Sequence, residues 1–189
     1  MKNIRILALV AAVSLAALAG TPIMGAAFAE TTVMVGGAPM YPSKNIVENA
    51  VNSRDHTTLV AAVKAAGLVD TLMSAGPFTV FAPVNKAFEK LPAGTVDTLL
   101  MPQNKPTLVA VLTYHVVPGK YSAADLRAAV TKGHGKAMLK TVQGEDLTVT
   151  EQGRKLEIVD AKGDKSTVTI ADVNQSNGVI HVVDTVLLP

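Results

Sequence analysis

Apolar residues in the first half of the chain recur every three or four positions, which is the spacing of an amphipathic helix. In residues 45–53 this spacing places Ile46, Val47, Ala50 and Val51 on one stripe. The same pattern predicts further helices at 56–67, 68–76, 86–91, 96–100 and 106–115. The first half of the chain is therefore expected to be mainly helical.

Several of the predicted helices have boundary residues that favour helix ends. Asp55 or Thr57 is a candidate N-cap for the helix at 56–67, because a short polar side chain accepts hydrogen bonds from free N–H groups. Gly67 is a candidate stop, since glycine readily adopts the left-handed conformation that ends many helices. Asn85 is in the same way a candidate N-cap for the helix that follows it.

Strand patterns dominate the second half of the chain. One early strand is predicted at 77–83, PFTVFAP, which is rich in aromatic and β-branched residues and ends at a proline. Asn177-Gly178 between two later strand patterns indicates a hairpin. Segregated helices and strands predict an α+β domain. The later strands are predicted at 137–142, 146–150, 155–160, 166–173 and 178–189.

The N-terminus has the pattern of an export signal. Lys2 and Arg5 precede an apolar run, and Ala27-Phe28-Ala29 fits a small-x-small cleavage site. The run is shorter than the roughly 20 residues of a membrane-spanning helix, and no later stretch is long enough to span. We therefore predict a signal peptide at 1–29 and a chain exported to the periplasm or the medium.

Residues 30–42 contain Gly-Gly and two prolines without any periodicity, which predicts a flexible linker ahead of one domain at 43–189. Cleavage would remove two basic residues and no acidic ones. Lys plus Arg would fall from 17 to 15, which equals the 15 Asp plus Glu. A chain without net charge offers no general attraction to nucleic acid or anionic lipid, so no nucleic-acid partner is expected.

The chain lacks the residues and motifs of common catalytic and metal sites. It has no cysteine, so disulfides, thiolate metal sites and thiol nucleophiles are excluded. None of the four histidines has a metal-ligand spacing to another His, Asp or Glu on one predicted element, and no nucleophile, phosphate-loop or dinucleotide motif is present. We expect no enzyme, no cofactor and no metal. His134 is expected in a solvated loop.

His181 lies in the apolar segment GVIHVVDTVLLP. A period of two places Val179, His181 and Val183 on one face and Ile180 and Val182 on the other. Both faces are apolar, so we expect a central strand that is covered on both sides. A histidine in such a strand is more often a hydrogen-bonded core residue than a ligand.

The segment TYHVVPG poses the question of whether His115 serves chemistry, partner contact or the core. The segment is apolar and leaves a predicted helix, so Tyr114 and His115 are expected to be partly buried. Their polar atoms then need hydrogen-bond partners, and Asn85 is one candidate. A structural role is the favoured interpretation, with partner contact as the alternative.

Three segments together resemble the signature blocks of the fasciclin (FAS1) domain family. They are FTVFAPVNKAF at 78–88, LTYHVVPG at 112–119 and NGVIHVVDTVLLP at 177–189, in the family's order and at about its spacing. The resemblance covers residues 43–189. It implies a wedge-shaped β-sandwich of about seven strands with a helical layer, which agrees with the α+β prediction.

The resemblance also implies a class of function. FAS1 domains are extracellular adhesion and interaction modules, and in animal members integrin contact maps to the Tyr-His block and to an Asp-Ile pair before the closing block. By position these are Tyr114, His115, Asp172 and Val173, where Val173 departs from the isoleucine. The chain has no Arg-Gly-Asp, and a bacterium has no integrins of its own, so the partner does not transfer with the site.

Two functions follow as hypotheses. The first is a secreted or periplasmic module that mediates adhesion or protein–protein interaction without catalysis. The second is an envelope carrier of a small apolar or lipid-like ligand, because the chain is 49% hydrophobic with few aromatic residues. The sequence does not name the partner.

Overall fold

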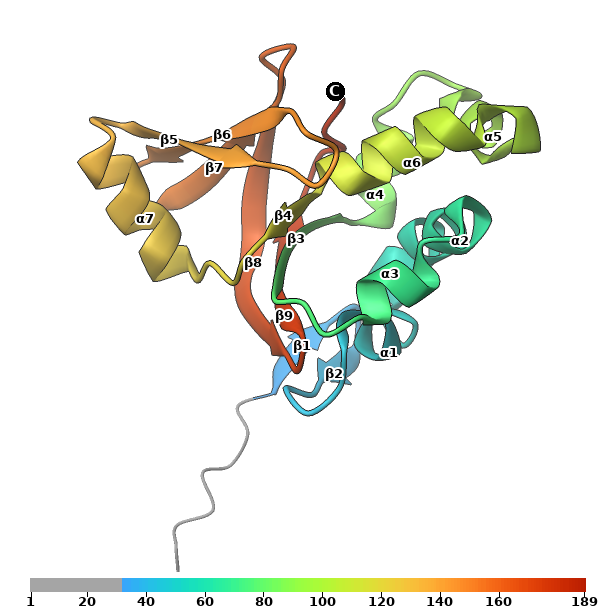
Figure 1. Ribbon diagram of the computed structural model, residues 1–189, viewed down its shortest axis with the longest axis horizontal. Helices are drawn as coiled ribbons and strands as arrows, with labels where there is room; N and C mark the ends of the chain where they lie inside the picture. The colour runs from blue at the N-terminus through green and yellow to red at the C-terminus, as the bar shows by residue number, and fades with distance from the viewer. Residues whose placement is uncertain (1–31) are drawn as a thin grey trace, which may run out of the picture.

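The fold is organised around one mixed sheet of seven strands with helices on either side (Figure 1). The computed structural model describes residues 32–189, so the predicted signal peptide at 1–29 lies outside the described residues. Strands β3 and β9 are parallel, and every other pair of neighbours is antiparallel. The α+β class and the seven strands are confirmed. In sheet order the strands are β4 (Val116–Pro118), β3 (Phe78–Pro83), β9 (Gly178–Val183), β8 (Lys165–Gln175), β7 (Lys155–Val159), β6 (Asp146–Gln152) and β5 (Lys136–Lys140).

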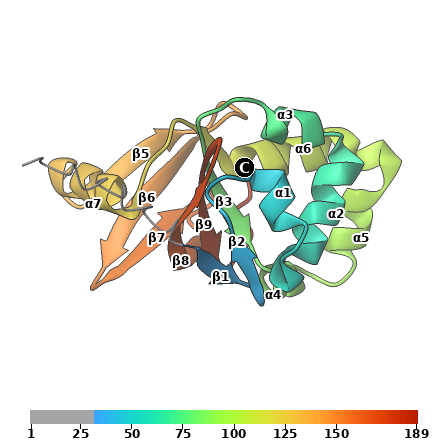
Figure 2. The ribbon, with the colours of Figure 1, turned by 90° about the horizontal axis from the view of Figure 1, so that it is seen from below.

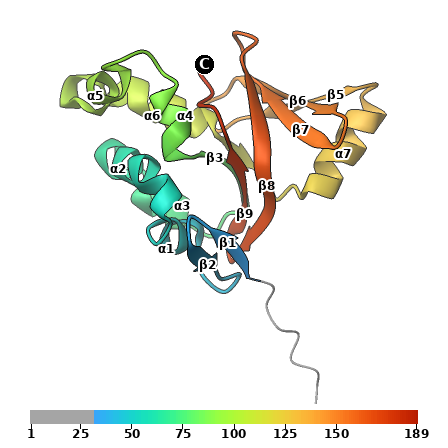
Figure 3. The same cartoon turned by 180° about the vertical axis from the view of Figure 1, so that it is seen from behind.

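The long strand β8 joins the two parts of the sheet. Its first residues pair with β7, and from Val168 onward it pairs with β9. Figure 3 shows β8 running between the β5–β7 strands and the helical layer. Register shifts mark β-bulges between Val168 and Ile170 and between Ile170 and Val173, and such bulges bend a strand. One strand can therefore serve both parts of the fold.

Six helices and two short 3-10 turns, Arg54–His56 and Pro102–Asn104, cover one side of β3 and β9 (Figure 2). The second helix ends at Gly67, as predicted, with a left-handed φ of 72°. A capping box between Asn45 and Glu48 begins the first helix. The helices are α1 (Ile46–Ala50), α2 (Thr57–Ala66), α3 (Val69–Met73), α4 (Asn85–Glu89), α5 (Thr95–Leu100) and α6 (Lys105–Tyr114).

A seventh helix, α7 (Ala123–Lys132), lies against β5 and β6 away from the other six (Figure 1). None of the helices predicted from the sequence corresponds to it. Ser122 and Asp125 form a capping box at its start, and Leu126 and Val130 are buried four residues apart. Both signals are legible in the sequence, so this helix could have been found.

The central strands separate two hydrophobic cores. Val80 and Ala82 of β3 face the six-helix side, which we call the helix-side core, and Phe81 faces the other, which we call the α7-side core. Strand β9 is buried along its whole length and alternates in the same way. The prediction that His181 lies in a doubly covered central strand is confirmed. The α7-side core contains Phe81, Tyr114, Val117, Ala123, Leu126, Val130, Leu139, Leu147, Val149, Leu156, Ile158, Val183 and Leu187.

The prediction of a flexible linker at 30–42 is wrong for residues 33–40. They form a hairpin of β1 (Val33–Val35) and β2 (Ala38–Met40). The Gly36-Gly37 turn has φ values of 58° and 76°, which suit a two-residue hairpin loop. Val35 and Met40 are buried in the helix-side core. Strands of three residues are too short to show a period, so the glycines and the two prolines suggested a linker.

Candidate binding site

Tyr114 ends α6 and is fully buried in the α7-side core. Its hydroxyl accepts a hydrogen bond from the Ala161 N–H at 2.9 Å and donates to the Asp146 carbonyl at 3.2 Å. These two backbone groups lie 47 and 32 residues away along the chain. The phenol therefore joins the end of α6 to the start of β6 and to the turn after β7.

His115 follows Tyr114 and is 2% exposed. Its Nδ1 donates to the Val111 carbonyl at 2.8 Å, and its Nε2 accepts from the Leu187 N–H at 3.0 Å. The second bond requires a neutral ring. Burial lowers the pKa of His115 to about 4, and the bond to Val111 offsets this only in part. The imidazole thus ties α6 to the C-terminal segment.

The prediction that Asn85 is a hydrogen-bond partner of the Tyr-His block is wrong. Asn85 is also not the N-cap of α4, because Val84 occupies that position without a side-chain bond. Its Oδ1 accepts from the Thr58 N–H at 3.0 Å, and its Nδ2 donates to the Arg54 carbonyl at 2.8 Å. Asn85 therefore caps the start of α2 from a neighbouring helix, as a structural residue.

His181 and Asp172 meet at the bulge of β8. The His181 Nε2 donates to the Tyr121 carbonyl at 2.8 Å, and its Nδ1 accepts from the Asp172 N–H at 3.3 Å. The ring stacks on Phe81 with centroids 5.8 Å apart. Burial lowers the pKa of His181, so the ring stays neutral. This geometry agrees with the expected hydrogen-bonded core histidine.

Asp172 has a left-handed φ of 58°, which is uncommon for a residue with a side chain. Its Oδ1 accepts from the Ala123 N–H at 2.7 Å, so it binds a free donor in the first turn of α7. Asp172 is half-buried, whereas Val173 is 1% exposed and packs in the helix-side core. Of the four residues that the resemblance suggested for partner contact, only Asp172 reaches the surface.

The remaining two histidines lie apart from these. His134 sits in the turn after α7, as expected, with a φ of 55°. His56 is buried beside Ser53, whose Oγ lies 2.9 Å from its Nδ1, and its Nε2 has no hydrogen-bond partner. Within residues 32–189 no group of three or more His, Cys, Asp or Glu is placed to hold a metal ion.

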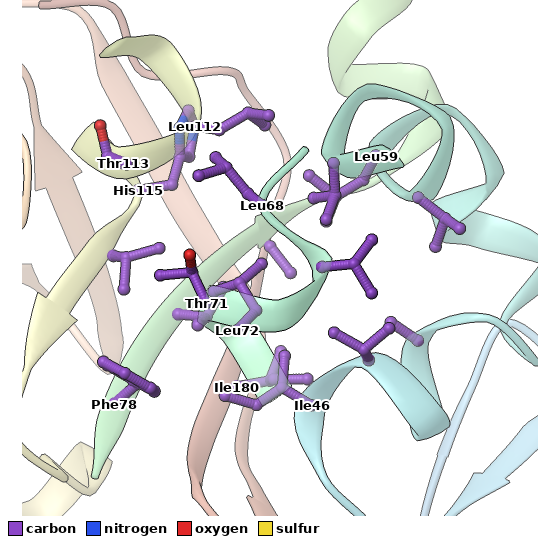
Figure 4. Close-up of a pocket in the computed structure, with 18 of the residues that line it drawn as sticks. Ile46, Leu59, Leu68, Thr71, Leu72, Phe78, Leu112, Thr113, His115 and Ile180 are labelled. Carbon is purple, nitrogen blue, oxygen red and sulfur yellow. The ribbon is translucent and has the colours of Figure 1, made fainter. Parts of the chain in front are cut away.

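An apolar pocket of about 80 Å³ lies between the helical layer and the sheet. Its walls come from α1, α2, α3, the end of α6 and strands β3, β4 and β9. Figure 4 shows Leu112 and His115 at one end of the pocket, Ile46 and Ile180 at the other, and Leu72 between them. A water-sized group needs about 10–15 Å³ of such space, so the pocket has room for roughly six of them.

Most of the residues that line the pocket are aliphatic. Lys64 is the one charged residue of the lining, because the buried ring of His115 is neutral. Asn177 holds part of this wall in place. Its Oδ1 accepts from the Ile46 N–H at 3.1 Å, and its Nδ2 donates to the carbonyls of Leu72 and Ser74. From the sequence, this asparagine is predicted only to mark a turn. The pocket has no sequence signal, because its walls come from segments far apart in the chain.

The Fasciclin domain family model matches residues 54–189. The chain belongs to the fasciclin family. A cyanobacterial relative, "Protein sll1483" of Synechocystis sp., is 47% identical over 173 residues, which cover 90% of this chain and 89% of the relative. The resemblance inferred from the three sequence blocks is thus confirmed.

Two further matches bear on the fold and on the kind of protein. "Cell surface glycolipoprotein MPB83" of Mycobacterium bovis is 38% identical over 122 residues, covering 65% of this chain and 48% of that protein. A solved FAS1 domain pair from the insect cell adhesion molecule Fasciclin I matches with a TM-score of 0.69 at 23% identity, over 79% of this chain and 52% of that one. The second match shows the fold. These fasciclin matches indicate no enzyme family.

Proposed function

We propose that this fasciclin chain is an exported, non-catalytic interaction module that contacts a protein or cell-surface partner. The proposal depends on one observation: the polar side chains of the family motifs are mostly buried and hydrogen-bonded within the fold. Tyr114, His115 and His181 are buried, and each hydrogen-bonds backbone groups. Such groups hold the fold together and are not directed at a substrate.

Asp172 is the motif residue that reaches the surface, so we place the contact around it. It projects from a bulge of β8 beside the first turn of α7, and its backbone and carboxylate are both hydrogen-bonded. A rigid, bulged strand is a suitable base for a contact surface. The cell-surface name of the mycobacterial relative and the adhesion role named for the insect protein support this choice.

Export is the second part of the proposal and rests on the sequence pattern at 1–29. The mycobacterial relative named as a cell-surface protein agrees with it. Within residues 32–189 the structure has no helix that is long and apolar enough to cross a membrane. Fractionation of the native bacterium with an antibody to the chain would test export, and recovery of unprocessed chain in the cytosol would contradict it.

Binding to whole cells tests the proposed contact. We would compare purified protein, residues 30–189, with the Asp172→Asn variant on cells of the same bacterium and of a host. Asparagine tolerates a left-handed φ and can still accept the Ala123 N–H, so this change removes the charge and keeps the fold. Asp164→Asn, in an exposed turn, is the matched control.

Loss of binding in Asp172→Asn, with binding kept in Asp164→Asn and equal melting temperatures, would support the contact. Absence of binding by the wild type to any of these cells would overturn the proposal. Equal binding by all three proteins would remove Asp172 from the contact.

The apolar pocket favours a second candidate, a carrier of a small apolar or lipid-like ligand. The pocket has room for about six methylene-sized groups, which is enough for one short acyl chain of a ligand. Lys64 in the lining could pair with an anionic group at the end of that acyl chain. Native mass spectrometry of protein from its own bacterium would reveal a retained ligand as added mass. Ala50→Phe should fill the pocket and abolish binding of a neutral apolar dye, whereas Ala65→Phe, on the exposed face of α2, should not.

A further inference from the structure

A second hollow of about 470 Å³ lies where β7 and β8 separate. The two strands pair from Val159 opposite Lys165 to Glu157 opposite Thr167. Beyond that point Lys155 and Leu156 pair only with β6, while β8 turns to pair with β9. We call the resulting hollow the β7–β8 groove. It is lined by Arg127, Arg154, Lys155, Leu156, Thr167, Val168, Thr169 and Ala171.

The β7–β8 groove is positively charged. Three of its eight lining residues are basic and none is acidic. Arg127 reaches in from α7, and its guanidinium is held by Glu151 at 3.2 Å and by the Arg154 carbonyl at 3.2 Å. Arg154 and Lys155 take part in none of the ion pairs found within residues 32–189. Two cationic side chains are therefore available to a ligand.

Apolar side chains line part of the groove, beside Thr167 and Thr169. They are Leu156, which is almost fully buried, Val168, which is half-buried, and Ala171. A ligand that fills the groove must offer negative charge to the basic side chains and apolar groups to this part of the lining. A polypeptide in an extended conformation does this, because its side chains alternate between two faces. A sulfated polysaccharide offers the charge without apolar side chains.

We propose that the β7–β8 groove binds an acidic, extended peptide segment of a partner protein. Carboxylates of the segment would pair with Arg154 and Lys155, and its alternate apolar side chains would contact Leu156 and Val168. The inference deepens the proposed interaction function and rests on it, since the acidic segment would occupy the groove while Asp172 would meet a donor group elsewhere on the same partner.

Fluorescence anisotropy tests the proposal with a labelled synthetic peptide in which glutamate alternates with alanine and leucine. The wild type should bind it, with affinity that falls as salt is added, and the double variant R154E/K155E should bind roughly tenfold or more weakly. The control double variant K136E/K162E changes the same charge at exposed positions outside the groove and should bind like the wild type.

Several outcomes would overturn the inference. Equal binding of a peptide with glutamine in place of glutamate would remove the charge requirement. Equal loss in both double variants would show an effect of net charge alone. Displacement of the peptide by a sulfated polysaccharide at lower concentration than by unlabelled peptide would assign the groove to that class of ligand.

The cell-binding assay separates this inference from the proposed function. If wild type and R154E/K155E bind cells equally, the interaction function stands and the groove is not its contact. If the peptide binds in the groove but no cells are bound, the groove assignment stands and the adhesion proposal fails.

Discussion

The two hydrophobic cores lie on opposite faces of β3 and β9 but are covered in different ways. The α7-side core is closed by one ten-residue helix and the curled strands β5–β7, and Phe81, Leu126 and Ile158 in it are fully buried. The helix-side core is covered partly by α1 and α3, of five residues each, and it contains the apolar pocket. Short helices leave more gaps at their ends than a longer helix does, so space for a ligand arises on that side.

Buried histidines link each core to backbone from elsewhere in the chain. His115 lines the pocket and binds Leu187, whereas His181 stacks on Phe81 and binds Tyr121. In both cases one ring nitrogen donates and the other accepts, so both rings work only when neutral. We therefore expect acid to destabilise both cores. We expect the loss of side-chain volume to destabilise the α7-side core more than the helix-side core.

The largest expected effect comes from removing volume in the α7-side core. Leu126→Ala should lower the free energy of unfolding by about 3–5 kcal/mol, because Leu126 is fully enclosed and the strands around it cannot collapse into the space. Leu72→Ala, beside the pocket, should cost only about 2 kcal/mol, since Leu72 already adjoins empty volume. Urea denaturation of both variants measures the difference. Equal losses would mean that the two cores are packed equally well.

The next effect is a loss of stability in acid. The folded pKa of His115, about 4, lies below the unfolded value near 6.5, so the unfolded chain takes up the proton first as pH falls. The contribution of His115 is therefore complete above about pH 6.5 and lost between there and pH 4, by roughly 3 kcal/mol. The pKa values of His181 and His56 are lowered by burial as well and act in the same direction.

Denaturation midpoints of wild type and His115→Ala across this pH range would measure that contribution. The difference between the two proteins should shrink as pH falls below 6.5. A difference that stays constant with pH would contradict a neutral, buried His115.

At neutral pH, His115→Ala should cost about 1–3 kcal/mol, because it leaves the Leu187 N–H and the Val111 carbonyl without their partner. His134→Asn, in an exposed turn whose left-handed φ asparagine tolerates, is the control and should be near neutral. Thermal melts of both variants suffice. An unchanged midpoint for His115→Ala would return the Tyr-His block to a role in partner contact.

Local patterns predicted much of this fold. Aromatic and β-branched residues placed β3, and alternation placed β9, although the predicted strand ran to residue 189 and β9 ends at Val183. The three signature blocks indicated the family. The roles of Asn85 and Asn177 were missed, since the groups they bind lie up to 131 residues away. The pocket and the β7–β8 groove depend on where short elements stop, and element ends are the part of a fold that sequence patterns define least.

The smallest expected effect tests how the cover of the α7-side core is fastened. Asp172→Ala removes the acceptor of the Ala123 N–H and forces alanine into a left-handed φ, so it should cost about 1–2 kcal/mol. Asp172→Asn keeps both features and should cost under about 0.5 kcal/mol. Hydrogen exchange at the start of α7 should rise in the alanine variant and not in the asparagine variant. If both variants exchange alike, the capping box of Ser122 and Asp125 alone holds that end, and the Asp172 carboxylate is free for a partner.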